Sequence, residues 1–183
     1  EFSFTSSSST TPSSVSHIFF TSGSTGRPKG CVVAHSALLS YCRAKSQVHR
    51  VDESSVCFVA SSLTFDPSLG DFFSTWCSGG VVALAPRSLI FSSLGACLSA
   101  THATHLLTSP SLFSTVTRPP SSSAPSPASS SSTTPPSSEW LPELRVVALG
   151  GEPMPRGMME AWSADSRLSV INTYGVPECC VYQ

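Results

Sequence analysis

Residues 20–30 (FTSGSTGRPKG) combine the features that a phosphate-binding loop needs. Glycines let backbone N–H groups approach an anion, hydroxyl groups donate to phosphate oxygens, and a lysine adds a mobile positive charge. The residues of these three kinds are Gly23, Gly26, Gly30, Thr21, Ser22, Ser24, Thr25 and Lys29. A flexible Gly/Ser linker is the alternative, but apolar strand candidates flank this segment tightly. It is not a Walker A loop, because Gly-Lys-Ser/Thr is absent.

Three further segments place useful groups beside predicted strands or helices. In residues 63–68 (LTFDPS), the carboxylate of Asp66 could bind a cation, or it could cap a helix that begins at Pro67. In residues 148–153 (ALGGEP), two glycines after a strand would let a flat ring approach the backbone. The alternative is an ordinary turn with Glu152 near a helix N-terminus. Residues 172–178 (NTYGVPE) follow the last predicted strand.

These four motifs resemble those of the adenylate-forming enzyme superfamily. That superfamily includes acyl-CoA synthetases, luciferases and the adenylation domains of nonribosomal peptide synthetases. The motifs stand in the family's order and approximate spacing, from His17 to the end of the chain. The resemblance is nearest to the nonribosomal-peptide-synthetase-like branch or the β-alanine-activating, aminoadipate-semialdehyde-dehydrogenase-like branch. It implies that ATP activates a carboxylic acid as an acyl-AMP, which then passes to a thiol of coenzyme A or of a carrier-protein phosphopantetheine.

The resemblance also implies roles for individual residues. The loop at 20–30 would guide the β- and γ-phosphates of ATP, with Lys29 as a catalytic cation. Asp66 stands where amino-acid-activating members use an aspartate to bind the ammonium group of the substrate. The backbone of Gly150, Gly151 and Glu152 would line the adenine pocket.

The last motif resembles the family's Asn-x-Tyr-Gly-x-Thr-Glu. Tyr174 would stack on adenine, with Asn172 and Gly175 beside the nucleotide, and Glu178 would bind Mg²⁺ as a catalytic residue. Pro177 stands where the family has threonine. This replacement removes a hydroxyl group and a backbone N–H donor that would hold charge on the transferring phosphate. A degenerate site is therefore one alternative.

The resemblance further implies an acyl pocket lined mostly by small and apolar residues. The expected lining residues are Asp66, Pro67, Gly70, Thr108, Val147, Leu149, Thr173 and Val181. Asp66 favours an amino acid as the substrate. The alternatives are an acyl-CoA synthetase for a carboxylic acid without an amino group and a nonfunctional remnant, and Pro177 favours the remnant.

Strand and helix patterns alternate along the chain, which predicts an α/β fold with a mostly parallel sheet flanked by helices. By resemblance, this is part of the large N-terminal domain of the adenylate-forming fold. The predicted strands are 17–21, 31–34, 56–59, 81–84, 105–108, 145–149 and 168–172, and the predicted helices are 36–47, 67–76, 89–100, 110–113 and 155–162. Ligands bind such sheets at the carboxyl ends of the strands, where these motifs lie.

Apolar spacing predicts which helix faces are buried. Leu38, Leu39 and Cys42 share one side of the first helix. Leu69, Phe72, Phe73 and Trp76 recur at i, i+3, i+4 and i+7 in the second helix. The strand at 81–84 reads as buried.

Composition divides the chain into four parts. Residues 1–16 form a Ser/Thr-rich segment that we expect to be disordered, and residues 118–138 form a Ser/Pro-rich low-complexity insert. Residues 17–117 would hold the phosphate loop and part of the acyl pocket, and residues 139–183 the adenine and Mg²⁺ sites. By resemblance, the ribose-binding aspartate and the small C-terminal domain with its catalytic lysine lie beyond Gln183. We therefore expect the isolated chain to bind nucleotide weakly and not to turn over.

Charge and cysteine content exclude other classes of function. The net charge is −1 and the basic residues are scattered, so no nucleic-acid surface is predicted. No apolar run predicts a membrane span or a secretory signal. The seven cysteines are expected to be reduced thiols of a cytoplasmic protein. His35 is expected to have a structural role, and His102 and His105 to form a surface pair.

Overall fold

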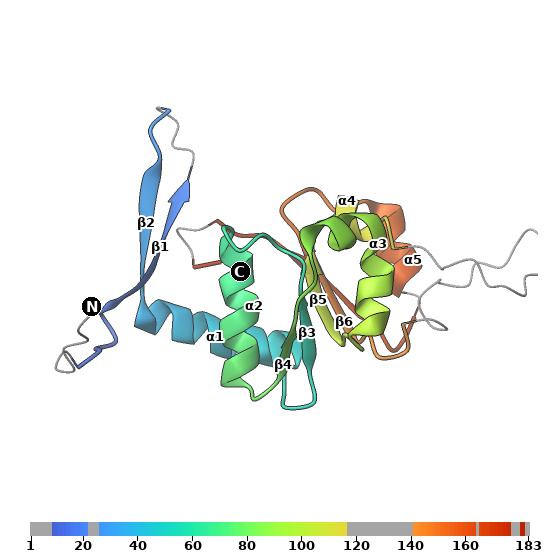
Figure 1. The fold of residues 1–183 in the computed structure, drawn as a ribbon, viewed down its shortest axis with the longest axis horizontal. Helices are drawn as coiled ribbons and strands as arrows, with labels where there is room; N and C mark the ends of the chain where they lie inside the picture. The colour runs from blue at the N-terminus through green and yellow to red at the C-terminus, as the bar shows by residue number, and fades with distance from the viewer. Residues whose placement is uncertain (1–8, 22–25, 117–140, 164, 177–179, 182–183) are drawn as a thin grey trace, which may run out of the picture.

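The computed structural model describes residues 9–21, 26–116, 141–163, 165–176 and 180–181. Within them the chain forms an antiparallel hairpin of two strands and a parallel sheet of five strands, with helices on both faces of the sheet (Figure 1). The fold is α/β, as the alternation of strand and helix patterns predicted.

The helices and strands lie close to their predicted positions. The strands are β1 (Val15–Thr21), β2 (Lys29–Ala34), β3 (Val56–Val59), β4 (Val81–Ala83), β5 (His105–Thr108), β6 (Val146–Gly150) and β7 (Ser169–Thr173). The helices are α1 (His35–His49), α2 (Asp66–Cys77), α3 (Arg87–Ala100), α4 (Pro110–Phe113) and α5 (Arg156–Ser163). β1 begins at Val15, inside the segment 1–16 that was expected to be disordered. The insert predicted at 118–138 lies outside the described residues.

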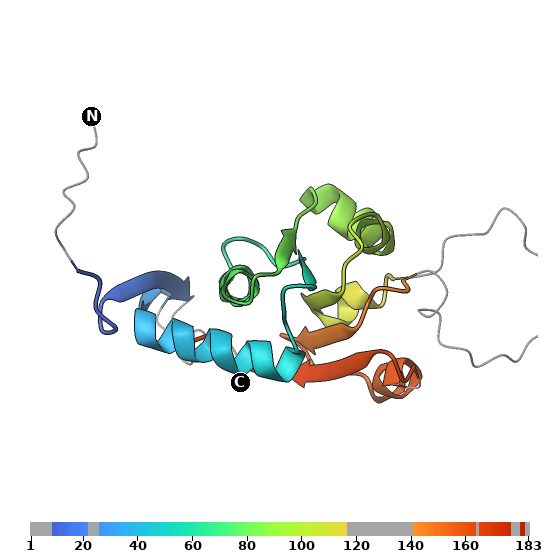
Figure 2. The same cartoon turned by 90° about the horizontal axis from the view of Figure 1, so that it is seen from below.

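The order of strands in the sheet is β4-β3-β5-β6-β7. The chain passes from β3 through α2 to β4 at one edge, and then crosses back through α3 to β5 and the remaining strands. This reversal places α1 and α2 on one face of the sheet and α3 and α5 on the other (Figures 1 and 2). A crevice is expected at the carboxyl ends of β3 and β5, where the winding direction changes.

The two faces of the sheet are packed differently. On the α3 and α5 face the core is apolar, and the rings of Phe113 and Trp162 lie 4.5 Å apart between their centroids. The opposite face buries a salt bridge between Lys45 of α1 and Asp71 of α2. Burying two charges costs desolvation energy, which their mutual attraction and hydrogen bond offset.

His105 corrects one prediction, because it is only 5% exposed and does not form a surface pair with His102. Its Nε2 atom donates to the backbone carbonyl of His49 at 2.9 Å, and its Nδ1 atom lies 2.7 Å from Oγ1 of Thr104. Burial is the main reason why the pKa of His105 is lowered. The exposed His102 lies near Glu143.

The buried side of α2 differs from the apolar side predicted by spacing. Trp76 is 57% exposed, whereas the helix turns small and polar residues toward α1 and the sheet. The hydroxyl groups of Ser74 and Thr75 donate to the carbonyls of Gly70 and Asp71, both at 2.6 Å, so these polar groups are paired within the helix. Small side chains allow close packing, which periodicity of large apolar residues does not reveal.

Three other apolar side chains are exposed, although the sequence predicted that they would be buried. Leu39 is exposed on α1, although Leu38 and Cys42 beside it are buried as predicted. Val81 and Leu84 are exposed because β4 is the edge strand of the sheet.

Two further features of the described residues are the state of the cysteines and the hydropathy of the helices. The cysteines described there include the free thiols of Cys42, Cys57, Cys77, Cys97 and Cys180. No helix in the described part of the chain combines the length and apolar character needed to cross a bilayer.

Candidate active site

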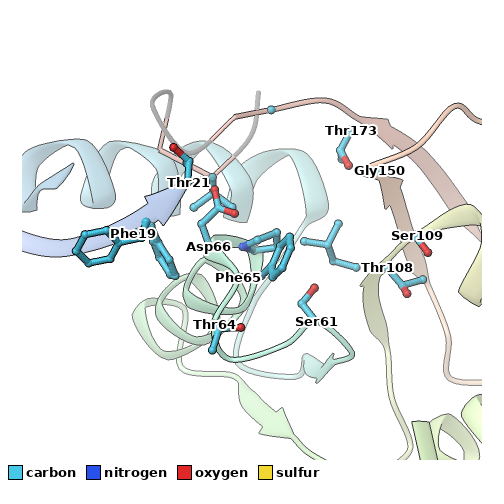
Figure 3. Close-up of a pocket in the computed structure, with 16 residues that line it drawn as sticks. Phe19, Thr21, Ser61, Thr64, Phe65, Asp66, Thr108, Ser109, Gly150 and Thr173 are labelled. Carbon is cyan, nitrogen blue, oxygen red and sulfur yellow. The ribbon is translucent and has the colours of Figure 1, made fainter. Parts of the chain in front are cut away.

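A cavity of about 620 Å³ lies at the carboxyl ends of the parallel strands, facing β1 and the first turn of α2. Figure 3 shows Thr21 and Asp66 on one side of it, with Gly150, Thr173 and Thr108 on the other. Its lining residues are Phe19, Phe20, Thr21, Ser61, Thr64, Phe65, Asp66, Pro67, Leu107, Thr108, Ser109, Gly150, Gly151, Thr173, Gly175 and Val181. The cavity therefore occupies the crevice that the strand order predicts.

Asp66 is the first residue of α2, and its side chain is buried on the cavity wall. The N-cap position is held by Phe65 in an extended conformation, with no side-chain cap hydrogen bond. Asp66 is therefore not the N-cap, which was the structural alternative. The partial positive charge of a helix N-terminus favours a carboxylate at this position. A buried carboxylate beside apolar groups is suited to binding a cation.

The opposite wall requires glycine. A Cβ atom on Gly150 would stand 2.2 Å from Oγ1 of Thr173 and 2.7 Å from its carbonyl oxygen. The Thr173 hydroxyl donates to the carbonyl of Leu149 at 3.2 Å, which fixes the side chain at the end of β7. Gly151 has a φ of +84°, a left-handed conformation that glycine adopts without strain. At Gly150 and Gly151 this wall therefore consists of backbone without side chains.

Glu152 does not line the cavity. Its Oε1 atom accepts a hydrogen bond from the backbone N–H of Ser111 at 2.5 Å, at the start of α4. That hydrogen bond is the main cause of the lowered pKa of Glu152. The carboxylate thus connects the loop after β6 to α4 and helps to hold Ser109 beside the cavity.

The predicted phosphate loop begins and ends in the β1–β2 hairpin. Thr21 lines the cavity, and Lys29 lies opposite Thr21 in the strand register. Gly30 pairs with Phe20 in the same register, and Gly26 has a φ of +77°. Ser22, Gly23, Ser24, Thr25, Pro177 and Glu178 lie outside the described residues. The described residues contain no cluster of three His, Cys, Asp or Glu side chains that could hold a metal ion.

Nine residues predicted as site residues surround the cavity. They are Thr21, Asp66, Pro67, Thr108, Gly150, Gly151, Thr173, Gly175 and Val181. They come from segments that are far apart in the sequence, and the strand ends bring them together.

Other predicted site residues lie away from the wall. Val147 and Leu149 are fully buried in the core on the α3 face, because alternate residues of β6 point to that face. Gly70 packs against the ring of Tyr41. Asn172 is exposed in β7, and Tyr174 is 80% exposed beyond it.

Sequence reasoning gave no role to seven residues of the wall. They are Phe19, Phe20, Ser61, Thr64, Phe65, Leu107 and Ser109. A signal was present for Ser61 and Ser109, since each follows the end of a central parallel strand. The aromatic side chains had no such signal, because their contribution depends on how the hairpin meets α2.

Comparison with known proteins bears on this arrangement. The family model described as AMP-binding enzyme matches residues 3–182. The chain belongs to the AMP-binding enzyme family. The resemblance inferred from the four motifs is therefore confirmed at the level of the family.

Curated members of this family that resemble the chain include fungal proteins. Nonribosomal peptide synthetase 8 of Aspergillus fumigatus is 30% identical over 171 residues, which is 93% of this chain and 2% of that protein. Nonribosomal peptide synthetase gloA of Glarea lozoyensis is 32% identical over 171 residues, with the same two coverages. The chain thus spans a small part of the length of these AMP-binding relatives.

Solved structures share the AMP-binding fold. The Vibrio cholerae adenylation domain AlmE, in complex with glycyl-adenosine-5'-phosphate, matches with a TM-score of 0.75 and 25% identity over 94% of this chain and 30% of that one. The N-terminal domain of FACL13 from Mycobacterium tuberculosis matches with a TM-score of 0.67 and 19% identity over 89% of this chain and 37% of that one. The parallel sheet with flanking helices is therefore the fold of these domains.

Proposed function

We propose that this chain is part of an enzyme that uses ATP to activate an amino acid as an aminoacyl-adenylate, with release of pyrophosphate. The observation that supports this most is the buried carboxylate of Asp66 on the cavity wall. The names of the fungal relatives and the glycyl-adenylate bound to the AlmE domain agree with an amino acid as the substrate.

Asp66 binds the ammonium group of the amino acid. A charge-assisted hydrogen bond of this kind is stronger away from water, and the apolar Phe65 and Val181 line the same cavity. A fatty acid offers no cation at this point and so does not form this charge-assisted hydrogen bond. The site therefore discriminates against acids without an amino group.

ATP is expected to lie along the hydroxyl-bearing side of the cavity. Thr108 and Thr173 carry hydroxyl groups there, and Gly150 with Gly151 presents a flat stretch of backbone. Thr21 lies on the other side of the cavity, and Lys29, its partner in the strand register, would supply a mobile cation from that side. These groups would orient the phosphates and offset negative charge on them.

In the proposed reaction a carboxylate oxygen of the amino acid attacks the α-phosphorus in line. A P–O bond forms, the bond between the α-phosphorus and the bridging oxygen breaks, and pyrophosphate leaves with the electron pair. Mg²⁺ bound with ATP would supply charge neutralisation, and Glu178 is its expected ligand.

The acyl group would then pass to a thiol, which we expect to be the phosphopantetheine of a carrier protein. The names of the relatives favour a carrier over coenzyme A. Reduced cysteines and the need for ATP agree with a cytoplasmic location.

The proposal is tested by ATP–pyrophosphate exchange in the full-length protein. Alanine should support exchange, and propionate, which lacks only the amino group, should not. Asp66→Ala should lower kcat/KM for alanine by at least about thirtyfold, because it removes one partner of a buried charge pair. Glu53→Gln, at an exposed acidic residue away from the cavity, should leave kcat/KM for alanine unchanged. Equal use of both acids by the unmodified protein would favour an acyl-CoA synthetase instead.

Pro177 provides a separate arm of this experiment. If no acid supports exchange and Pro177→Thr restores it, the site is degenerate and the missing hydroxyl group and N–H are the cause. If neither protein exchanges, the proposed function is wrong.

A further inference from the structure

The cavity ends sooner than the resemblance implies. Three residues expected to line the acyl pocket, namely Gly70, Val147 and Leu149, are not on its wall. Asp66 and Gly70 are four residues apart on α2 and so lie on the same side of the helix. The cavity therefore reaches Asp66 but does not extend along α2 as far as Gly70, which is one helical turn further.

Tyr41 of α1 does not line the cavity itself but packs against Gly70, one helical turn beyond Asp66. A Cβ atom on Gly70 would stand 2.6 Å from the Tyr41 hydroxyl oxygen and 2.8 Å from Cε1 of its ring. Such distances do not occur between real side chains, so the tip of the ring occupies the site that a side chain at position 70 would need. Tyr41 is itself buried.

Residues at the C-terminal end of the described chain complete this wall. Val181 lines the cavity and packs in one buried cluster with Tyr41, Leu38 and Cys180. Burial raises the pKa of the Cys180 thiol, and the negative charge of Asp66 raises it further. Packed side chains of this cluster thus lie behind Val181 in the cavity wall.

We propose that Tyr41 closes the deep end of the acyl pocket beside Asp66 and restricts the substrate to amino acids with no side chain larger than a methyl group. Glycine, alanine and β-alanine meet this condition. A longer side chain would have to displace the buried Tyr41 ring. This inference rests on the proposed function, and Tyr41 acts as a specificity residue that has no part in the chemistry.

The test is ATP–pyrophosphate exchange in the full-length protein with glycine, alanine, β-alanine, leucine and phenylalanine. The unmodified protein should use one of the first three best. Tyr41→Ala should raise the ratio of kcat/KM for leucine over alanine by at least about tenfold, since each methylene group accommodated in a pocket changes selectivity by that order. Tyr41→Phe keeps the ring and should leave the ratio unchanged.

Tyr41→Leu serves if Tyr41→Ala does not fold, because leucine stays apolar and lacks the distal part of the ring. It should shift the same ratio in the same direction. A preference of the unmodified protein for leucine or phenylalanine would overturn the inference while leaving the proposed function intact. An unchanged ratio in a folded Tyr41→Leu variant would also overturn it. Absence of exchange with every acid would remove both proposals together.

Discussion

Gly150 is the residue at which the site tolerates change least. β6 and β7 approach so closely at their carboxyl ends that a Cβ atom on Gly150 would stand 2.2 Å from the hydroxyl oxygen of Thr173. Both residues line the cavity. The close packing of β6 against β7 and the shape of the cavity therefore both require that position 150 has no side chain.

We predict that Gly150→Ala lowers the free energy of unfolding by about 1–3 kcal/mol, because the strand ends must separate to admit the methyl group. Chemical denaturation of the purified protein measures this. Gly157→Ala is the matched control, since apart from its chain neighbours and the backbone of α5 no heavy atom lies within 4 Å of its Cβ position. That control should gain up to about 1 kcal/mol from helix propensity. Equal stability of the two variants would contradict the crowding at Gly150.

The sequence predicts the residues of the site better than their arrangement. The resemblance of the motifs implied that Asp66, Gly150 and Thr173 belong to the site, and all three line the cavity. It did not point to Tyr41, whose effect arises from the packing of α1 against Gly70 of α2. Contacts between helices of this kind depend on rotamers and crossing geometry, which leave no local signal in the sequence.

At the scale of elements, α1 and α2 contact the sheet through buried polar and charged groups. His49 at the end of α1 and His105 in β5 are both buried, and Lys45 and Asp71 lie beside them. Burial lowers the pKa of His49 to about 3, with smaller electrostatic contributions from Lys45 and His105. His49 is therefore neutral in the folded protein near neutral pH.

This lowered pKa predicts acid sensitivity. Unfolded histidine takes up a proton below a pH of about 6.5, whereas buried His49 does not, so the unfolded state binds more protons. The stabilisation is fully present above about pH 6.5 and falls by up to about 1.4 kcal/mol per pH unit as the pH drops toward 3. His49→Gln should flatten this acid limb when the free energy of unfolding is measured between pH 7 and pH 4.

His102→Gln is the control for that measurement, because His102 is exposed and away from the α1–sheet contact. The free energy of unfolding of this variant should fall between pH 7 and pH 4 as steeply as that of the unmodified protein. Lys45 and Asp71 are unchanged in both variants, so their contribution cancels in the comparison. A limb that stays equally steep in His49→Gln would show that His49 does not govern it.

The sequence predicts where the helices and strands lie more accurately than it predicts which of their side chains are buried. Strand and helix boundaries agree within a few residues, because Gly and Pro and the apolar runs mark them locally. The buried side of α2 did not follow, since Ser74 and Thr75 satisfy their hydroxyl groups within the helix and can then be buried. Large apolar residues indicate a buried side only when a partner covers them.

At the scale of the whole molecule, the fold class was predictable because alternating strands and helices leave few arrangements other than a parallel sheet with two helical layers. The exposure of large apolar side chains was not predictable. Phe72, Phe73 and Trp76 form an aromatic cluster on α2, with ring centroids 5.2 Å and 5.9 Å from that of Trp76. Trp76 is 57% exposed in this cluster.

The exposed tryptophan of this cluster predicts that the isolated 183-residue chain self-associates and binds a hydrophobic dye. Trp76→Lys should reduce both effects, because it removes exposed apolar area and places a positive charge in the last turn of α2, where the helix dipole favours it. Ser40→Lys adds the same charge at an exposed position of α1 and leaves the cluster intact, so it should reduce them less. Sedimentation velocity and dye fluorescence measure the two effects. A monomeric chain that binds no dye, or equal responses of the two variants, would mean that the aromatic cluster on α2 does not determine how the isolated chain behaves in solution.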